Sequence, residues 1–250
     1  MHNNSRSILY GCGVFSTIRV MNGEPFLWEK HWRRLLNNAK TVGVNLAKFR
    51  EDDTRQQLKE AIATEGISDG RARITFTDDS SSELWPYGDE EQTGLSFLIG
   101  ALRPIPENFR LTVSPYIINS RSPLTGIKSC NYLDKILALD EAKALGFDEA
   151  IQVNERGKVT SATMANVFWL KDKILYTPSL KTGCLPGTTR EFVMENLACR
   201  EVELTKDELN SADAIFLTSA GLGIVAVNEF EGKNLLIRDH PILALWPELH

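Results

Sequence analysis

Apolar and polar positions follow two clear patterns in the first forty residues of the chain. Residues 10–20 form a largely apolar run after a glycine turn, which predicts a buried strand. The dipeptide Asn22-Gly23 is typical of a tight hairpin, so we expect a returning strand to follow it. Over residues 29–42 the apolar side chains recur at helical spacing, which predicts an amphipathic helix that ends at Gly43.

The rest of the chain reads as a mixture of helices and short strands. The pattern predicts a polar helix over residues 52–63, strands over residues 73–77, 95–102, 111–118, 149–153, 158–160, 167–170, 174–177 and 214–217, and a helix over residues 191–199. A segment rich in Ser, Pro and Gly separates two halves, which predicts a linker between domains. The expected division is residues 1–118, a linker over residues 119–126, and residues 127–250.

One further helix is expected to begin at residues 127–133 and to run to about Gly146, since glycine takes the left-handed conformation that closes a helix. Its apolar residues recur at helical spacing, so we expect them to pack against a core: Leu133, Ile136, Leu137 and Leu145. Lys128 would then lie where loop becomes helix, held rigidly with its tip in a cleft. Considered alone, a lysine at a helix start is more typical of a solvated surface charge.

Composition and charge narrow the class of protein. A chain of 250 residues with 42% hydrophobic and 24% charged residues suits one large globular domain or two modest ones. The net charge of -5 gives no support for binding to nucleic acid or to a membrane surface. Residues 1–7 lack the apolar core of a signal peptide, and no apolar run is long enough to cross a bilayer. The expectation is a cytoplasmic protein.

Metal sites and histidine-based nucleophilic sites are also disfavoured. The four cysteines are scattered without the paired spacing of a zinc site or the density of a disulfide framework. Two of the four histidines lie next to the chain ends, at His2 and His250. We therefore expect no metal site and no Ser-His-Asp triad.

Three places in the sequence could bind a phosphate. Thr188 and Thr189 follow a glycine and open a helix, where unpaired N–H groups attract an anion, although a threonine N-cap is as common. Ser219 and Ala220 form a second turn of small residues. Arg34 lies one turn into the first helix, where a solvated charge is the ordinary interpretation. Together with a lysine at a cleft, they indicate pyridoxal phosphate, the phosphorylated cofactor that a lysine holds covalently.

The order of motifs in the chain resembles the class IV (fold type IV) pyridoxal-phosphate enzymes. This family includes branched-chain aminotransferases, D-amino acid aminotransferases and aminodeoxychorismate lyase. The matching segments, which extend from about residue 9 to residue 232, are YGCGVFSTIRV, HWRRL, GIKSCNYLDKILALDEAKALGFDEAIQV, GKVTSATMANVFWLKDKILYTPSL, GCLPGTTREFV and ADAIFLTSAGLGIVAV. The resemblance implies an α/β fold with a small N-terminal domain, a larger barrel-like C-terminal domain that carries the lysine, and the cofactor in the cleft between them.

The resemblance also assigns roles to individual residues. Lys128 matches the lysine that forms a Schiff base with the cofactor, and Arg34 matches the phosphate-binding arginine. Phosphate contacts are also implied for two pairs of small residues, Thr188 with Thr189 and Ser219 with Ala220. Tyr132 lies one residue out of register from the tyrosine that branched-chain aminotransferases carry near the phenolic oxygen of the cofactor.

Two positions depart from the family pattern. Ser161 stands where the family carries a glutamate that pairs with the pyridine nitrogen. Since a neutral hydroxyl supplies no charge for a protonated ring, we expect a weaker electron sink. Ser16 occupies a position that is usually glutamate in the aminotransferases and threonine in aminodeoxychorismate lyase. The arginine-rich carboxylate-binding pattern of D-amino acid aminotransferases is not visible in residues 78–87.

Three functions remain open at this point. The first is amino transfer between an amino acid or amine and a 2-keto acid, with Lys128, Ser16 and Tyr132 as catalytic candidates. The second is aminodeoxychorismate lyase activity, which forms 4-aminobenzoate and pyruvate. The third is a member that binds the cofactor with weak chemistry because of Ser161. The resemblance implies a homodimer, and because the family places further strands before its Tyr-Gly motif, either the small domain lacks an edge or the N-terminus is incomplete.

Overall fold

The chain folds into two compact units. The structure, a computed structural model, describes residues 4–81, 92–235 and 239–246. The first unit contains Met1–Leu102 and Ile127–Tyr132, and the second contains Arg103–Gly126 and Leu133–His250. These units differ from the division expected from the sequence, because residues 103–118 join the second unit and the short segment with Lys128 joins the first.

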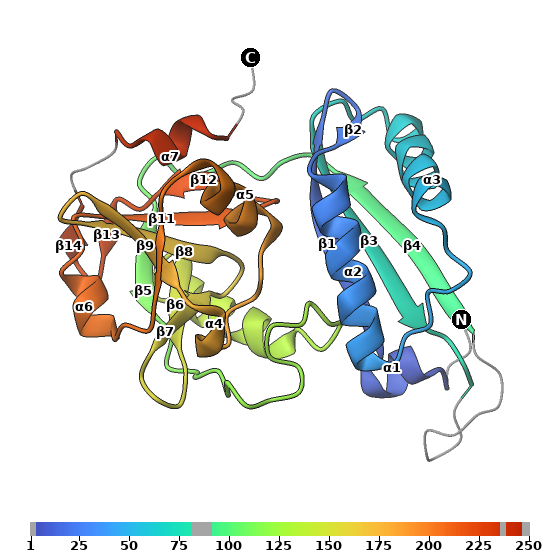
Figure 1. The fold of residues 1–250 in the computed structure, drawn as a ribbon, viewed down its shortest axis with the longest axis horizontal. Helices are drawn as coiled ribbons and strands as arrows, with labels where there is room; N and C mark the ends of the chain where they lie inside the picture. The colour runs from blue at the N-terminus through green and yellow to red at the C-terminus, as the bar shows by residue number, and fades with distance from the viewer. Residues whose placement is uncertain (1–3, 82–91, 236–238, 247–250) are drawn as a thin grey trace. The chain divides into compact units, whose positions relative to one another are not determined.

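The first unit is a four-stranded antiparallel sheet with helices packed on one face (Figure 1). The sheet has the order β2-β1-β3-β4 and consists of β1 (Gly13–Met21), β2 (Glu24–Pro25), β3 (Gly70–Asp78) and β4 (Thr93–Gly100). The helices are α1 (Arg6–Tyr10), α2 (Trp28–Val42) and α3 (Glu51–Thr64). The expected hairpin after β1 is confirmed, since Asn22 and Gly23 both have positive φ and Met21 pairs with Glu24.

The core of this unit follows from the side-chain periods of a strand, two residues, and of a helix, about 3.6 residues. Side chains at alternate positions of β1 and β3 face α2 and α3, and every third or fourth side chain of the helices faces back. The buried residues of this core include Val14, Ile18, Ile74, Phe76, Trp32, Leu35 and Leu58. The predicted apolar face of α2 is therefore confirmed.

The second unit contains two five-stranded sheets with the orders β10-β9-β8-β11-β12 and β14-β13-β5-β6-β7. Its strands are β5 (Arg110–Val113), β6 (Glu149–Val153), β7 (Val159–Ala162), β8 (Asn166–Lys171), β9 (Ile174–Pro178), β10 (Arg200–Val202), β11 (Ala214–Ser219), β12 (Gly223–Ala226), β13 (Glu229–Phe230) and β14 (Lys233–Asn234). Its helices are α4 (Leu133–Ala144), the 3-10 turn η1 (Leu180–Thr182), α5 (Thr188–Asn196), α6 (Lys206–Asn210) and α7 (Pro241–Ala244). The mixed α/β class expected from the sequence is confirmed.

Helix α4 differs from its prediction at its start and on its buried face. It begins at Leu133 rather than near Lys128, and it ends before Gly146, which has the expected positive φ of 83°. The four residues expected to face a core are all exposed: Leu133, Ile136, Leu137 and Leu145. The prediction was wrong because α4 packs on β6 and buries the opposite stripe of Ala138, Leu139 and Ala142, where the two small alanines allow a close approach.

Three other predicted boundaries move. Part of the strand expected over residues 10–20 is helix α1, and β1 begins only at Gly13. The strand expected over residues 111–118 ends at Val113. The helix expected from residue 191 begins at Thr188, so both threonines of that motif lie in its first turn.

Candidate functional site

The backbone beside β1 places Lys128 in the first unit. Val14 and Ser129 form an antiparallel bridge, the Phe15 N–H donates to the Lys128 carbonyl at 3.0 Å, and the Cys130 N–H donates to the Gly13 carbonyl at 2.8 Å. A Cβ on Gly13 would lie 2.8 Å from the Cys130 sulfur, so glycine is what lets the segment approach. Lys128 therefore lies in an extended segment that adds to the edge of β1, rather than at a helix start as expected.

Aromatic side chains surround the amine of Lys128. Its Nζ donates to the Tyr132 hydroxyl at 3.1 Å and lies 4.5 Å from the centroid of the Phe15 ring. The Phe15 and Tyr132 rings meet edge to face with centroids 5.1 Å apart. The guanidinium of Arg73 also lies over Phe15, at 3.5 Å from the centroid. The structure thus brings the Lys128 amine and the Tyr132 hydroxyl together beside the Phe15 ring, which also contacts a second cation, Arg73.

A buried polar group lies on the other side of β1. Successive residues of a strand face opposite ways, so Ser16 points toward α2 while Phe15 points away from it. The Ser16 hydroxyl accepts a hydrogen bond from Arg34 Nη2 at 2.6 Å and lies 2.7 Å from His31 Nδ1. All three residues are buried. Arg34 is therefore turned inward, as predicted for an anion-binding arginine and in contrast to a solvated one.

The electrostatics of this group follow from its burial. Burial lowers the pKa of His31 well below its usual value, and the nearby charges of Arg34 and Lys128 lower this pKa further. The His31 imidazole is therefore neutral at pH 7. A neutral imidazole can accept or donate a hydrogen bond without adding a third positive charge to those of Arg34 and Lys128.

The N-terminus of α5 in the second unit has the features of an anion site. Gly187 is its N-cap and no side chain caps this end. The Thr189 hydroxyl is buried and has no hydrogen-bond partner among the residues that the structure describes. A Cβ on Gly187 would lie 1.9 Å from Asn166 Oδ1, so the turn before the helix requires glycine. Backbone N–H groups at a helix start and a buried hydroxyl such as that of Thr189 are donors that suit an anion.

The second predicted turn lies at the end of β11, against which α5 packs. Ser219 ends this strand and its hydroxyl accepts from the Leu222 N–H at 3.1 Å, while Ala220 is buried. The neighbouring Thr218 hydroxyl is buried and, in the described part of the chain, lacks a partner. Thr189 on α5 and Thr218 on β11 thus each have a buried hydroxyl without a partner in the described residues, and these two elements pack against each other.

Ser161 lies on β7, buried and directly opposite Gln152 on β6. The same hairpin carries Glu149, whose carboxylate accepts from the backbone N–H groups of Ala150, Thr163 and Met164. Burial raises the pKa of Glu149, and these hydrogen bonds partly offset the effect. Ser161, the residue of this hairpin that the resemblance assigns to the cofactor, has a neutral side chain, and the nearby acidic residue Glu149 is bonded to backbone N–H groups instead.

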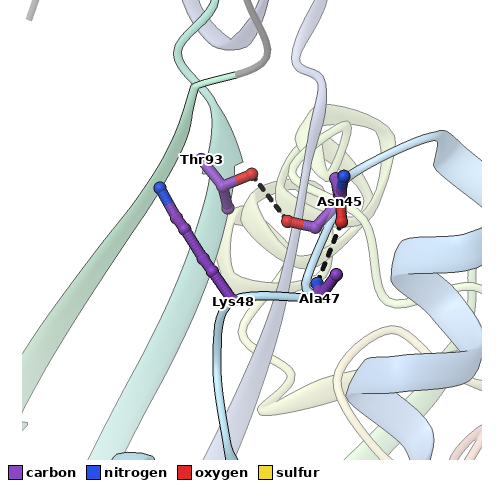
Figure 2. A pocket seen from close by; sticks show the side chains of 4 residues that line it. All are labelled: Asn45, Ala47, Lys48 and Thr93. Carbon is purple, nitrogen blue, oxygen red and sulfur yellow. Dashed lines mark hydrogen bonds between the residues drawn. The ribbon is translucent and has the colours of Figure 1, made fainter.

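A surface hollow elsewhere in the first unit contains none of the candidate residues. It has a volume of about 130 Å³ and is lined by Asn45, Ala47, Lys48 and Thr93 (Figure 2). The Thr93 hydroxyl and the Ala47 N–H both donate to Asn45, at 2.7 and 2.9 Å. Two of its polar groups thus donate to Asn45. Among the described residues there is no cluster of three possible metal ligands and no helix that could cross a membrane.

Sequence reasoning missed several neighbours of the candidate residues. Phe15, His31 and Arg73 were not singled out, although His31 lies in the same motif as Arg34. A histidine three residues before a candidate arginine on an amphipathic helix could have been assigned to the same face. Arg73 contacts Phe15 only through the pairing of β1 with β3, which the sequence does not specify.

Comparison with known proteins establishes the family. A family model described as amino-transferase class IV matches residues 13–230. The chain belongs to the class IV aminotransferase family. It is therefore an enzyme of a family that includes branched-chain and D-amino acid aminotransferases and aminodeoxychorismate lyase, and enzymes of this family use pyridoxal phosphate.

Individual relatives come from more than one branch of this family. The chain is 29% identical to a D-alanine aminotransferase of Bacillus licheniformis over 92% of this chain and 83% of the relative. It is 31% identical to an aminodeoxychorismate lyase of Bacillus subtilis over 90% of this chain and 80% of the relative. A crystal structure of the branched-chain aminotransferase of Thermoproteus uzoniensis with norvaline aligns with a TM-score of 0.87, at 27% identity, over 98% of this chain and 86% of the other. The expected fold type is confirmed.

Proposed function

We propose that this class IV aminotransferase uses pyridoxal phosphate bound to Lys128 to move an amino group between an amino acid, or another amine, and a 2-keto acid. The observation that supports it best is the position of the Lys128 amine, fixed by the bridge to β1 and set between the Tyr132 hydroxyl and the Phe15 ring. A lysine amine that contacts a tyrosine hydroxyl and a phenylalanine ring differs from an ordinary solvated surface charge.

The residues present fit the phosphate of this cofactor. The Thr189 hydroxyl is buried without a partner in the described residues, at a helix start that no side chain caps. We assign to the phosphate this hydroxyl, the first-turn N–H groups that include Thr188, and the turn at Ser219 and Ala220. By resemblance we assign the Arg34 guanidinium to the same phosphate. Each is a donor or a small residue, as a dianion requires.

The chemistry divides between the cofactor and the chain. When bound, pyridoxal phosphate withdraws electrons from the carbon that carries the substrate amine, so that a C–H bond there can break. The Lys128 amine is placed to take up and return this proton, and the Tyr132 hydroxyl 3.1 Å away orients that amine. Ser16 is fully buried, so it acts through the guanidinium that it holds and is a positioning residue in this proposal.

Aminodeoxychorismate lyase activity is the second candidate. The observation that favours it is the hydroxyl at Ser16, which occurs where the lyase carries threonine and the aminotransferases carry glutamate. Since Ser16 accepts a hydrogen bond from Arg34, a glutamate there would instead place a charge against this arginine. The neutral Ser161 favours the third outcome, a member that binds the cofactor and turns over slowly.

A substrate panel with Lys128→Ala as the control tests these assignments. The wild-type protein with added cofactor is expected to show a visible absorbance that Lys128→Ala loses, and to consume a keto acid together with an amine donor. Turnover of aminodeoxychorismate alone would select the lyase. Absorbance without turnover of either substrate would select the weak member, and absence of bound cofactor would refute all three.

We further propose that the protein is a cytoplasmic homodimer, as the family resemblance implies. The exposed leucine face of α4 supports association with a second copy, since Leu133 and Leu137 lie one turn apart and are 67% and 52% exposed. We expect Leu137→Glu to lower the apparent mass in sedimentation experiments from dimer to monomer. Lys143→Glu, on the same helix at an exposed polar position, is the matched control. An unchanged dimer in Leu137→Glu would exclude this face.

A further inference from the structure

The Phe15 ring contacts two cations from different parts of the first unit. The guanidinium carbon of Arg73 lies 3.5 Å from the ring centroid, and Nζ of Lys128 lies 4.5 Å from it. The two positive charges are therefore at most about 8 Å apart, which is the sum of these distances. An aromatic ring attracts each cation separately, but the two cations repel each other. The proposed function uses the lysine and leaves the arginine without a role.

The register of the sheet fixes the position of Arg73. Thr17 and Arg73 are partners across β1 and β3, so the Arg73 side chain lies on the same face as Phe15. Its Nε donates to the Thr75 hydroxyl at 3.2 Å, and its side chain forms a hydrogen bond with the Cys130 thiol. An arginine stays protonated over the whole pH range of ordinary proteins. The charge of Arg73 is therefore permanent and is held beside the ring.

The contacts of Arg73 do not neutralise this charge. In the described part of the chain its polar and ring contacts are Phe15, Thr75 and Cys130. Burial raises the pKa of the Cys130 thiol, an effect that the charge of Arg73 and its hydrogen bond partly offset. The thiol is therefore protonated and neutral at pH 7. Since none of these contacts is negatively charged, the field of Arg73 acts on the Lys128 amine.

We propose that Arg73 is a positioning residue that acts through Lys128: its fixed charge favours the neutral form of the amine and so makes this amine a better nucleophile and proton acceptor near neutral pH. A neighbouring cation repels the ammonium form and leaves the neutral form unaffected. An ammonium group can neither attack a carbonyl carbon nor take up a proton, whereas a neutral amine can do both. This inference rests on the proposed function, in which the same amine holds the cofactor and moves a proton.

Three further titratable groups lie in contact with the amine or near it, on Tyr132, His31 and Arg34. The Tyr132 hydroxyl, 3.1 Å from Nζ, can accept from the ammonium or donate to the neutral amine, so it suits both forms. Burial lowers the pKa of His31 well below its usual value, and the charges of Arg34 and Lys128 lower it further, so this imidazole is neutral at pH 7. Arg34 has the same sign of charge as Arg73. None of the three adds a negative charge that would oppose the effect of Arg73.

Competitive labelling of the full chain without cofactor tests this inference. Acetic anhydride reacts with neutral amines, and mass spectrometry measures each lysine separately. We expect the pH midpoint of Lys128 labelling to rise by about one unit in Arg73→Met, so that the labelling rate at pH 7 falls about tenfold. Above both midpoints the rates of the two proteins should be equal, which a loss of packing alone would not produce. Arg73→Lys keeps a positive charge and should keep most of the wild-type rate.

Two controls and a second readout accompany this experiment. Lys143 on α4 is exposed and should be labelled equally in every variant. Arg55→Met removes an arginine from α3, which packs on the other face of the sheet, and should leave the Lys128 midpoint unchanged. With pyridoxal phosphate added at pH 7, the visible absorbance that depends on Lys128 should appear about tenfold more slowly in Arg73→Met than in the wild-type protein.

Two results would overturn this inference while leaving the proposed function intact. One is an unchanged Lys128 midpoint in Arg73→Met, in a protein whose wild-type form shows the Lys128-dependent absorbance. The other is a labelling rate that falls equally at every pH in Arg73→Met and Arg73→Lys, which would make Arg73 only a packing residue. If Arg73→Met does not fold, Arg73→Gln takes its place. Wild-type protein without Lys128-dependent absorbance would instead refute the proposed function, whatever the labelling shows.

Discussion

Replacing Gly187 with alanine tests how tightly the start of α5 is built. The backbone of Gly187 is extended, with φ -71° and ψ 140°, so alanine can adopt it without backbone strain. The added Cβ would lie 1.9 Å from Oδ1 of Asn166 and 3.1 Å from its Cγ. Asn166 is buried and its Nδ2 donates to the Leu185 carbonyl at 2.9 Å, so the side chain must turn away and give up this bond.

The expected loss of stability follows from three contributions. A buried polar group left without its hydrogen bond costs about 1–3 kcal/mol. Alanine is a poorer N-cap than glycine by about 0.5–1 kcal/mol. Alanine also lowers the conformational entropy of the unfolded chain, which stabilises the folded state by about 0.4–1 kcal/mol. The last two nearly cancel, so we expect Gly187→Ala to lower the free energy of unfolding by about 1–3 kcal/mol.

Urea unfolding of a double-mutant cycle isolates the contact. Asn166→Ala removes the clashing atom, so Gly187→Ala should cost at least about 1 kcal/mol less in that background than in the wild-type protein. Gly100→Ala is the control, since its Cβ meets nothing within 4 Å. If Gly187→Ala costs the same in both backgrounds, the requirement for glycine does not come from Asn166.

Two further predictions concern buried polar side chains. Because the pKa of His31 is lowered in the folded state, the unfolded chain binds a proton first as the pH falls below about 6.5, and stability should drop by up to about 1.4 kcal/mol per pH unit. In urea unfolding at several pH values, His31→Asn should lose this slope, while other groups such as Glu149 contribute equally to both proteins; equal slopes would contradict a neutral His31. Thr189→Val should keep or slightly raise the melting temperature without cofactor, since it removes an orphaned hydroxyl, yet weaken cofactor binding about tenfold in spectroscopic titration. Unchanged binding would show that this hydroxyl does not meet the phosphate.

Hydrophobic periodicity predicted some faces of the molecule correctly and one wrongly, for a physical reason. In α2 the large side chains Trp32 and Leu35 are the buried ones, so the apolar stripe and the packed stripe coincide. In α4, Leu133, Ile136 and Leu137 form an apolar stripe that is exposed, while Ala138, Leu139 and Ala142 are buried. Periodicity locates an apolar stripe but does not say which neighbour covers it. Alanine carries too little apolar area to stand out in the pattern, although it permits the closest approach.

The candidate site was predictable where it depends on local motifs and not where it depends on strand pairing. Lys128 and Arg34 were singled out because the short segments around them resemble family motifs, whereas each taken alone is more typical of a solvated charge. The contacts of Lys128 with Phe15 come from a bridge between residues more than a hundred positions apart, which no local pattern encodes. The relation between Gln152 and Ser161 depends likewise on the register of β6 and β7.

The alternation of β1 explains why two adjacent residues serve separate parts of the candidate site. Phe15 faces the Lys128 amine, and Ser16 faces the Arg34 guanidinium on the other side of the sheet. Because the side-chain period of a strand is two, a shift of one residue would exchange these faces and take the ring away from the Lys128 amine and the hydroxyl away from the Arg34 guanidinium. The pairing of Phe15 with Thr75 and of Ser16 with Ile74 therefore determines at once which side chain faces the amine and which faces the guanidinium. Substitutions that loosen this register, even far from Lys128, should impair both cofactor attachment and phosphate binding at once.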